Sequence, residues 1–412
     1  MTTQLSEDQK KALEILKSDD NIFLTGAAGS GKSFLLRSYL RDKDIPILAS
    51  TGSAAILVGG RTFHSFFGLG IMEGGVDATV ERALKNKRLV KRLKKTKTVI
   101  IDEISMISGP TLNAAESIAR KIYSNSLPWG GMRVIVVGDF AQLPPVNPYA
   151  REKEWAFLDR AWQLSNFKTV WLKKIMRTQD RDFLEVLNSV RDGHITNQVK
   201  TFLNAKISAK LDGEFTRLFS HRGDVENYNL SKLEQIKHPT HSFKTIYSGK
   251  EKDIETFRKH SPIGEIIHIK KDALIMLRQN DQAGRWVNGS LGKIESISAG
   301  TLGIKLLTGI KVEIEMAEFT MLDPEGKPVV TATNFPISLA WAMTIHKAQG
   351  TSLDRMLVDL RRVWEPGQAY VALSRARDPN SLYIEGWNEK VIFSDPQVTK
   401  FHSLLENSIP NV

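Results

Sequence analysis

The stretch that decides the fold is LTGAAGSGKSFLL, which runs from Leu24 to Leu36. It contains Gly26, four intervening residues and then Gly31-Lys32-Ser33, the pattern of a phosphate-binding loop. The glycines let backbone amides turn toward phosphate oxygens, and the helix that starts near Lys32 adds its positive end. Lys32 is predicted to reach the β- and γ-phosphates, and the Ser33 hydroxyl to coordinate Mg²⁺. By itself the loop fits a kinase, a GTPase switch, an unfoldase or a nucleic-acid motor.

Short apolar runs that end in turn or polar residues surround this loop. They lie at 21–25, 46–50, 98–101 and 133–137, after a predicted helix at 6–17. Such runs are typical of buried parallel strands, and their alternation with helices predicts an α/β sheet with helices on both faces. Ligands then collect at the carboxyl ends of the strands.

A second α/β pattern begins around Trp171, with predicted strands at 217–220, 356–360 and 382–385. Between about 237 and 334 the pattern changes. Apolar and charged residues alternate from Ile310 to Met316, and Asn288-Gly289 and Thr308-Gly309 are turn signals. This texture predicts a small β-barrel inserted into the second lobe.

Composition narrows the class of protein. A chain of 412 residues is too long for one ordinary core, which predicts at least two domains. The formal net charge of +11 favours a polyanionic partner, of which nucleic acid is the commonest, although a solvated basic surface would give the same number. The absence of Cys excludes disulfides and Cys-ligated zinc. No apolar run would span a bilayer and the start resembles no targeting peptide, so a cytosolic location is expected.

The segment from Arg82 to Lys97 holds nine Lys or Arg residues and no acid. Leu84, Leu89, Val90 and Leu93 could form one face of a helix there. Two interpretations remain open at this point: a solvated basic helix, or a small subdomain that lies beside a phosphate backbone.

Two further motifs make the site hydrolytic. The apolar run VIIDEIS delivers Asp102 and Glu103 to a strand end, where Asp102 can hold Mg²⁺ and Glu103 can deprotonate the attacking water. The run RVIVVGDFAQLPPV ends in Gly138-Asp139 and places Gln142 nearby, where a neutral amide can sense the γ-phosphate.

Arg177 and Arg375 are predicted to supply cations to the γ-phosphate from the second lobe, as transition-state charge in phosphoryl transfer requires. For each the alternative is a surface ion pair, and Arg377 competes with Arg375 for the role. Gln9 fits either a capping box with Ser6 or a contact with the adenine edge.

Together these motifs resemble superfamily 1B DNA helicases, and most closely the petite integration frequency (PIF) family. The matching stretches occur in family order over nearly the whole chain; they are GAAGSGKS, STGSAA, TFHSFFG, IDEISM, GDFAQLPPV, FLEVLNSVRDG, ALIMLRQND, WVNGSLG, FPISLAWAMTIHKAQG and YVALSRAR.

The resemblance implies an α/β fold of two RecA-like P-loop lobes, with a small basic insertion in lobe one and an SH3-like β-barrel insertion in lobe two. The expected boundaries are 1–68 and 96–170 for lobe one, 69–95 for its insertion, 171–237 and 335–412 for lobe two, and 238–334 for the SH3-like domain. It also implies an ATP- and Mg²⁺-dependent motor that moves 5′ to 3′ on single-stranded DNA and unwinds duplex, with family roles in repair, recombination and telomere maintenance.

The resemblance also implies the binding residues. Gln9 shifts toward adenine contact, and Arg177 and Arg375 match arginine-finger positions. The expected nucleotide-binding residues are Gln9, Gly26, Ala27, Ala28, Gly29, Ser30, Gly31, Lys32, Ser33 and Gly350. The expected DNA-binding residues are Thr51, Gly52, Phe63 and His64 on the first lobe, and Asn288, Gly289, Thr344, His346, Lys347 and Gln349 on the second. Phe63, Phe66 and Phe67 could each stack a base or belong to the core.

Alternatives remain. A RecD-type helicase is one, and an ATP-dependent protein that remodels DNA complexes without strand separation is another. The chain starts directly at the helicase core, so a bacterial or phage source and an association with the nucleoid are expected. Expected partners are single-stranded DNA, forked or 5′-tailed duplex and G-quadruplex DNA, bound by a monomer.

Overall fold

The computed structural model describes residues 5–146, 152–207, 213–220, 222–281 and 285–408, and the chain forms two compact units. The first, here called the P-loop unit, comprises Thr2–Arg177, Thr320–Val329 and Pro396–Val412. The second unit comprises Thr178–Phe319 and Val330–Asp395. Each is described by itself.

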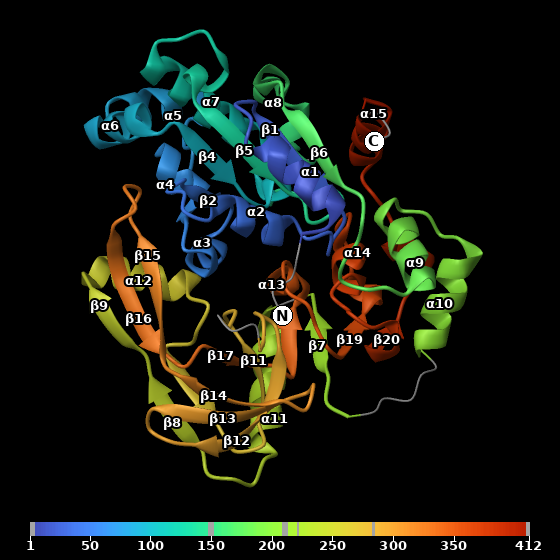
Figure 1. The fold of residues 1–412 in the computed structure, drawn as a ribbon. Helices are drawn as coiled ribbons and strands as arrows, with labels where there is room; N and C mark the ends of the chain where they lie inside the picture. The colour runs from blue at the N-terminus through green and yellow to red at the C-terminus, as the bar shows by residue number, and fades with distance from the viewer. Residues whose placement is uncertain (1–4, 147–151, 208–212, 221, 282–284, 409–412) are drawn as a thin grey trace. The chain divides into compact units, whose positions relative to one another are not determined.

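The P-loop unit is built on a six-stranded parallel sheet of order β3-β2-β4-β5-β1-β6 (Figure 1). The phosphate-binding loop leaves the carboxyl end of β1, which is paired on both sides, with β5 and with β6. The four predicted strands of this lobe are confirmed to within two residues. The strands are β1 Ile22–Gly26, β2 Ile47–Ala49, β3 Arg61–Thr62, β4 Thr98–Ile101, β5 Arg133–Val137 and β6 Lys168–Leu172.

Helices cover both faces of this sheet because successive strand residues point to opposite sides. Ile22 and Leu24 of β1 pack with α1 and α2, whereas Phe23 between them packs into a larger core on the other face. That larger core includes residues of α4 to α8 and of the C-terminal α15. The helices are α1 Glu7–Leu16, α2 Lys32–Leu40, α3 Gly52–Val58, α4 Phe63–Phe67, α5 Gly75–Leu84, α6 Lys87–Lys95, α7 Gly109–Tyr123, α8 Arg160–Ser165 and α15 Pro396–Ser408.

The boundaries of the two units correct the sequence expectation at three places. Trp171 does not open the second lobe, because β6 pairs with β1 and extends the first sheet. The division follows Arg177, and the hairpin end Thr320–Val329 belongs to the P-loop unit. The expected range 335–412 also ends too late, since α15 completes the core of the P-loop unit.

Aromatic stacking explains the position of α15. The ring of Phe401 stacks on Phe157 with centroids 4.2 Å apart, and it lies 5.6 Å from the fully buried Phe140. Val398 is buried in the same core. Without this helix those rings would face water, at a cost that scales with the apolar area exposed.

The second unit has a four-stranded parallel sheet of order β18-β7-β19-β20, and it confirms the three strands predicted there. The strands are β7 Thr216–Phe219, β18 Ala342–Thr344, β19 Met356–Asp359 and β20 Leu382–Gly386. Its helices are α9 Arg181–Arg191, α10 Asn197–Ile207, α11 Arg222–Glu234, α13 Ile345–Ala348 and α14 Gln368–Leu373.

Between α11 and β18 the chain forms antiparallel β-structure, as the alternating pattern predicts. A five-stranded sheet has the order β14-β13-β12-β11-β17, and Val312 and Ile314 of β14 face its buried side. Smaller sheets have the orders β10-β8 and β15-β16-β9. The elements are β8 His241–Lys244, β9 Ile246–Gly249, α12 Glu251–His260, β10 Ile266–Ile269, β11 Leu274–Leu277, β12 Leu291–Ile297, β13 Thr301–Leu306, β14 Lys311–Glu315, β15 Ala317–Leu322, β16 Pro328–Asn334 and β17 Ile337–Leu339.

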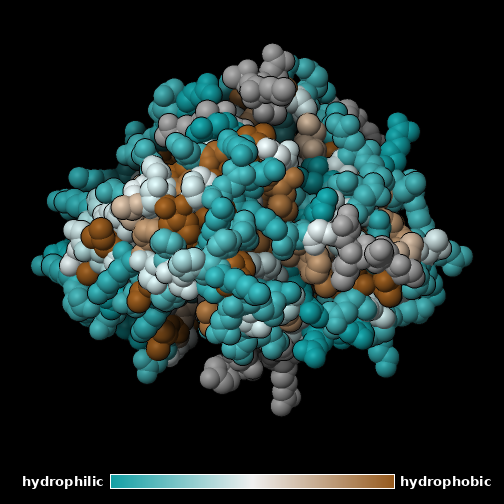
Figure 2. Space-filling view, turned by 90° about the horizontal axis from the view of Figure 1, so that it is seen from below, coloured by the Kyte–Doolittle hydropathy of each residue, from teal (hydrophilic) through white to brown (hydrophobic). Residues whose placement is uncertain are grey.

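Among the described residues, no helix has the length and apolar character needed to cross a membrane. On the face shown in Figure 2, hydrophobic side chains form patches that are separated by hydrophilic ones.

The packing of α15 gives a stability prediction. Phe401→Ala should lower the free energy of unfolding by about 2 to 3 kcal/mol, below the range for a fully buried Phe because the ring is partly exposed. Leu404→Ala on the same helix is the control, since Leu404 is 59% exposed and should change little. Urea unfolding of both variants measures the difference, and equal effects would contradict the assigned packing of α15.

Candidate active site

The phosphate-binding loop has a backbone that only glycine tolerates at three positions. Gly26, Gly29 and Gly31 have φ values of 148°, 84° and 90°. A Cβ at Gly31 would lie 2.4 Å from Nε2 of Gln9, and one at Gly29 would lie 2.5 Å from Cβ of Arg177. Lys32 donates to the carbonyl oxygens of Gly26 at 2.7 Å and Ala27 at 3.2 Å. The loop is therefore closely packed by Gln9 and Arg177, and the Lys32 ammonium group is bonded to carbonyl oxygens of the loop itself.

Gln9 forms the predicted capping box and also contacts the phosphate-binding loop. Its Oε1 accepts from the Ser6 backbone amide at 3.1 Å, and its backbone amide donates to Ser6 Oγ, so the capping box is confirmed. Its Nε2 lies 3.4 Å from the carbonyl oxygen of Ser30 in the phosphate-binding loop. The cap thus fixes the side chain against the loop, and the contact with adenine stays a prediction.

Arg177 lies beside the phosphate-binding loop within the P-loop unit, not in the second lobe as expected. The Met176 amide donates to the carbonyl oxygen of Gly29 at 2.8 Å, and the Arg177 side chain packs against Gly29. The register of β6 is the reason. Because β6 runs parallel to β1, with Leu172 opposite Gly26, the segment after β6 leaves the sheet at the same edge as the loop.

The two carboxylates follow β4. The Glu103 amide donates to Oδ1 of Asp102 at 3.0 Å. Burial and the neighbouring Glu103 carboxylate raise the pKa of Asp102 to about 7, against the opposing effects of the Glu103 amide and the Lys32 ammonium. The backbone of Glu103 has φ 51° and ψ 52°, a left-handed conformation that residues other than Gly, Asn and Asp rarely adopt. Such local strain is typical of functional positions.

These residues fit a magnesium ion. Mg²⁺ is usually held by one or two carboxylates, phosphate oxygens and water rather than by an all-protein cage. The described residues contain no cluster of three or more His, Cys, Asp or Glu that could hold a metal by themselves. The Ser33 side chain is exposed at the start of α2, and a divalent cation would offset the crowding of negative charge at Asp102.

Gln142 is held by its own strand-end loop. It is 5% exposed, and its Nε2 lies 3.5 Å from Oδ2 of the fully buried Asp139. The Gly138 amide donates to the carbonyl oxygen of Leu24, which ties the end of β5 to β1 just before the loop. Asp139 therefore orients Gln142, a role that the sequence analysis did not assign.

Thr25, the residue that precedes Gly26, was not predicted as a site residue. The hydroxyls of Thr25 and Ser30 are buried, and neither has a hydrogen-bond partner among the described residues. The only signal for Thr25 was its place at the end of the apolar run.

In the second unit Arg375 is 1% exposed, so a surface ion pair is the wrong interpretation of this residue. It donates to the carbonyl oxygen of Val371 at 2.7 Å, and through Nη1 to those of Ala348 and Thr351 at 3.4 and 3.3 Å. It therefore joins the end of α14 to the segment after α13. Arg377 is half-buried and lies 3.8 Å from Asp354.

Six predicted DNA-binding residues lie in this second unit. Thr344 is 5% exposed, and its hydroxyl caps α13 by accepting from the Lys347 amide. Its side chain therefore stabilises the start of this helix and is little accessible to a ligand. Lys347 is exposed, while His346 is half-buried and burial lowers its pKa. Gln349 is half-buried and is followed by Gly350 at φ 75°.

The inserted β-structure meets the segment after α13 within the second unit. A Cβ at Gly289 would lie 2.9 Å from the carbonyl oxygen of Ser352, so Asn288-Gly289 packs against the chain just beyond Gly350. The structure thus brings together two parts of the predicted DNA track that are about 60 residues apart in sequence.

In the P-loop unit, Thr51 is exposed and caps α3, and Gly52 begins that helix. His64 is half-buried, and burial lowers its pKa. Phe63 was expected to bind DNA, with base stacking and core packing both left open, and the structure favours the core: its ring is fully buried against Phe67 at 5.0 Å, and Phe66 is fully buried as well. The short α4 turns its rings into the core, which leaves no ring face for a base.

Comparisons with known proteins agree with this geometry. Residues 4–201 match the model of the PIF1-like helicase family, and residues 313–390 match a model described as a helicase. The ATP-dependent DNA helicase Pif1 of Bdellovibrio bacteriovorus is 49% identical over 98% of this chain and 92% of its own.

Solved structures are also similar. Pif1 from a Bacteroides species in complex with ADP-AlF4 has a TM-score of 0.86 and 27% identity, with 98% of both chains covered. The Bacteroides Pif1 complex with ADP-AlF3 and single-stranded DNA has a TM-score of 0.65 at the same identity and coverage. The fold is therefore the mixed α/β, RecA-like fold of these helicases.

The raised pKa of Asp102 predicts a pH dependence of stability. Because the native pKa lies above the ordinary value of 3.8, the folded state binds more protons between about pH 4 and 7, and stability falls as pH rises through that window. Asp102→Asn removes this effect, so it should raise Tm more at pH 8 than at pH 5 without nucleotide or Mg²⁺. The control is Asp19→Asn at an exposed loop residue. An equal change in Tm at both pH values for Asp102→Asn would contradict the assignment.

Proposed function

Because the chain belongs to the PIF1-like helicase family and is an ATP-dependent DNA helicase, we propose that it moves 5′ to 3′ along single-stranded DNA and separates the duplex ahead of it. One observation supports the ATP hydrolysis that would drive this movement, whereas the 5′-to-3′ direction and the strand separation rest on the family resemblance. The phosphate-binding loop, the Asp102–Glu103 pair and Gln142 follow β1, β4 and β5, which are neighbours in one parallel sheet. Carboxyl ends of parallel strands share an edge, so the groups for binding, hydrolysis and sensing meet there.

The chemistry follows from these side chains. Lys32 binds the phosphates, and Glu103 takes the proton of the attacking water. Ser33 and Asp102 would hold Mg²⁺, which when bound neutralises phosphate charge. The left-handed backbone at Glu103 supports the role of base, because it turns this side chain away from the direction that a continuing strand would give.

Arg177 and Arg375 are proposed to stabilise the charge of the transition state. Arg177 does so from beside the loop, and its contact with Gly29 supports that role. For Arg375 the support is its motif and its link to the segment that follows α13. A movement of the Arg375 guanidinium would loosen its bonds to the carbonyl oxygens of Ala348 and Thr351 and so alter the segment proposed to bind DNA.

We propose that the strand runs over Thr51, Gly52 and His64 of the P-loop unit, and over Asn288, Gly289, His346, Lys347 and Gln349 of the second unit. Thr344 supports this track indirectly, because its hydroxyl caps the helix that carries His346 and Lys347. The contact of Gly289 with Ser352 and the exposure of Lys347 support the second group. Hydroxyls, amides and lysine suit phosphate contacts.

Forked or 5′-tailed duplex is the proposed substrate, and binding of G-quadruplex DNA and a monomeric state stay predictions. The five-stranded antiparallel sheet supports the SH3-like assignment of the insertion.

Glu103→Gln tests the hydrolytic site. It keeps the size of the side chain and removes the base, so ATP turnover stimulated by single-stranded DNA should fall by about 10² to 10⁴-fold while nucleotide binding persists. Glu14→Gln on the exposed side of α1 is a control. Steady-state ATPase and fluorescent-nucleotide titration measure the two effects, and retention of full turnover by Glu103→Gln would refute the role of base.

Strand displacement tests polarity. A duplex with a 5′ single-stranded tail should be unwound in the presence of ATP and Mg²⁺, and the same duplex with a 3′ tail should not. Unwinding of the 3′-tailed substrate would refute the direction. ATP turnover without displacement of either would favour a remodelling protein.

A further inference from the structure

The short helix α6 carries a row of exposed lysines that the proposed mechanism does not use. Its sequence, KRLVKRLKK, places Leu89 and Leu93 fully in the core. At about 100° per residue, Lys87, Lys91, Lys94 and Lys95 fall within an arc of about 100° on the opposite side. All four are exposed, and the row is about 12 Å long at 1.5 Å per residue. We call these residues the α6 lysine face.

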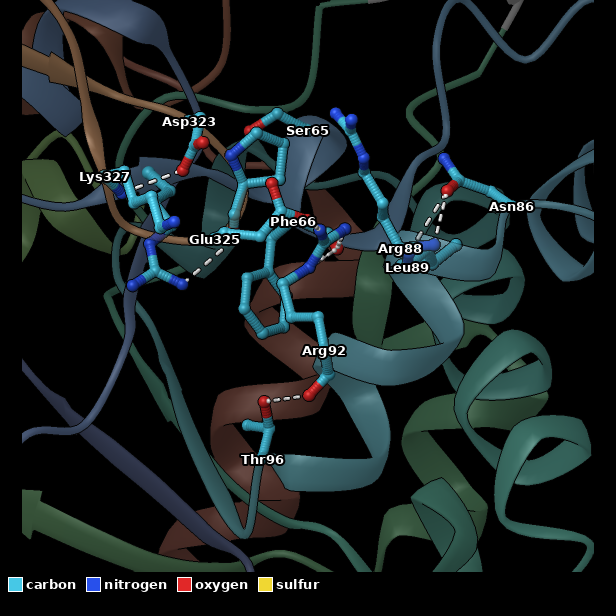
Figure 3. A network of polar contacts seen from close by, with 12 residues as sticks. Ser65, Phe66, Asn86, Arg88, Leu89, Arg92, Thr96, Asp323, Glu325 and Lys327 are labelled. Carbon is cyan, nitrogen blue, oxygen red and sulfur yellow. Dashed lines mark hydrogen bonds and ion pairs between the residues drawn. The ribbon is translucent and has the colours of Figure 1, made fainter.

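Intramolecular pairing does not account for these charges. Arg92, on the side of α6, already has partners within the chain: it donates to the carbonyl oxygen of Phe66 and forms an ion pair with Glu325, as Figure 3 shows. Asn86 caps the helix through the amides of Arg88 and Leu89. Within the part of the chain that the structure describes, none of the four lysines has an ion pair or a hydrogen bond of its side chain.

The row destabilises the helix that carries it. Lys87 and Lys91, and Lys91 and Lys95, are like charges at i and i+4, which repel on a helix surface. Lysine near the C-terminal end is favourable with the helix dipole, but Lys87 at the N-terminal end is not. A bound polyanion would relieve this repulsion.

A groove beside the row indicates which polyanion fits. It has a volume of about 480 Å³ and is lined by the four lysines together with Leu84 of α5 and Val90. None of these six residues is aromatic or acidic. Proteins that hold single strands combine cations with aromatic rings on which bases stack, whereas this groove offers aliphatic carbon and ammonium groups only. It suits a ligand that presents phosphates and hides its bases.

We propose that the α6 lysine face binds the phosphate backbone of duplex DNA, namely the duplex arm of the substrate being unwound. This inference rests on the proposed helicase function and extends it to a second DNA contact, separate from the single-strand track. Duplex DNA carries one charge per 1.7 Å of axis, so a row of ammonium groups about 12 Å long would face a dense array of phosphates. Recognition of this kind is independent of base sequence.

The test measures binding of a blunt-ended duplex and of oligo-dT by fluorescence anisotropy over a series of KCl concentrations, without nucleotide. The variant carries Lys87→Gln, Lys91→Gln, Lys94→Gln and Lys95→Gln; glutamine keeps helix propensity. With about 0.9 counterions released per phosphate contact, loss of three or four contacts should lower the magnitude of the duplex salt slope by about 3. Affinity for the duplex at low salt should fall at least tenfold, while oligo-dT binding and ATPase stimulated by oligo-dT stay unchanged.

The matched control carries Lys11→Gln, Lys17→Gln, Lys43→Gln and Lys121→Gln, four exposed lysines of the same unit with the same change in net charge. It should leave the duplex slope nearly unchanged. A variant with arginine at positions 87, 91, 94 and 95 should retain duplex binding. If the glutamine variant unfolds early, Lys91→Gln alone should still lower the slope by about 0.9.

Three outcomes would overturn the proposal. An equal loss in the control would assign the effect to net charge, and an equal loss for oligo-dT would assign the row to single strands. An unchanged duplex slope would mean that the α6 lysine face does not contact duplex DNA. Since duplex binding is measured without ATP, a failure of these predictions is distinguishable from a failure of translocation, which the tailed substrates report.

Discussion

The parallel pairing of β1 with β5 on one side and β6 on the other is the constraint on which the active site depends. It directs the phosphate-binding loop, the Asp139–Gln142 loop and the segment that ends in Arg177 to one edge of the sheet. The apolar side chains of β1 maintain this arrangement by packing on alternate faces of the sheet, since Phe23 lies in one core while Ile22 and Leu24 lie in the other. The geometry of the candidate site therefore depends on buried apolar residues that are not themselves among its polar groups.

Two local features are accommodated by this frame. Asp102 is an acid in a place that favours its protonated form, beside a second carboxylate and an ammonium group. Glu103 has a left-handed backbone. Both cost folding free energy, and both lie where a cation and a phosphate would be bound, which is the pattern expected of sites whose groups are arranged for chemistry rather than for stability.

In the second unit, the residues proposed to contact nucleotide and those proposed to contact DNA are linked to each other. Arg375, in the motif assigned to ATP, holds the carbonyls of Ala348 and Thr351, and the next residue, Ser352, contacts Gly289 of the inserted β-structure. A shift of the buried guanidinium would therefore be felt by the loops proposed to hold the strand. In the P-loop unit, buried leucines and Arg92 hold α6 in place, while the lysines on its outer side remain at the surface.

The sequence by itself determined the strands around the phosphate-binding loop, the carboxylate pair, the parallel sheet of the second unit and the family, because short apolar runs and motif spacing are local properties. It left Gln9 between two roles, and the structure shows that the capping box itself holds the side chain at the loop. It misplaced Arg177, α15 and Phe63. The position of Arg177 depends on which strand pairs with β6. The position of α15 depends on the aromatic core into which Phe401 packs. The burial of Phe63 depends on the orientation of a five-residue helix. Only the tertiary structure decided these, since strand pairing and burial depend on contacts between residues far apart in the chain.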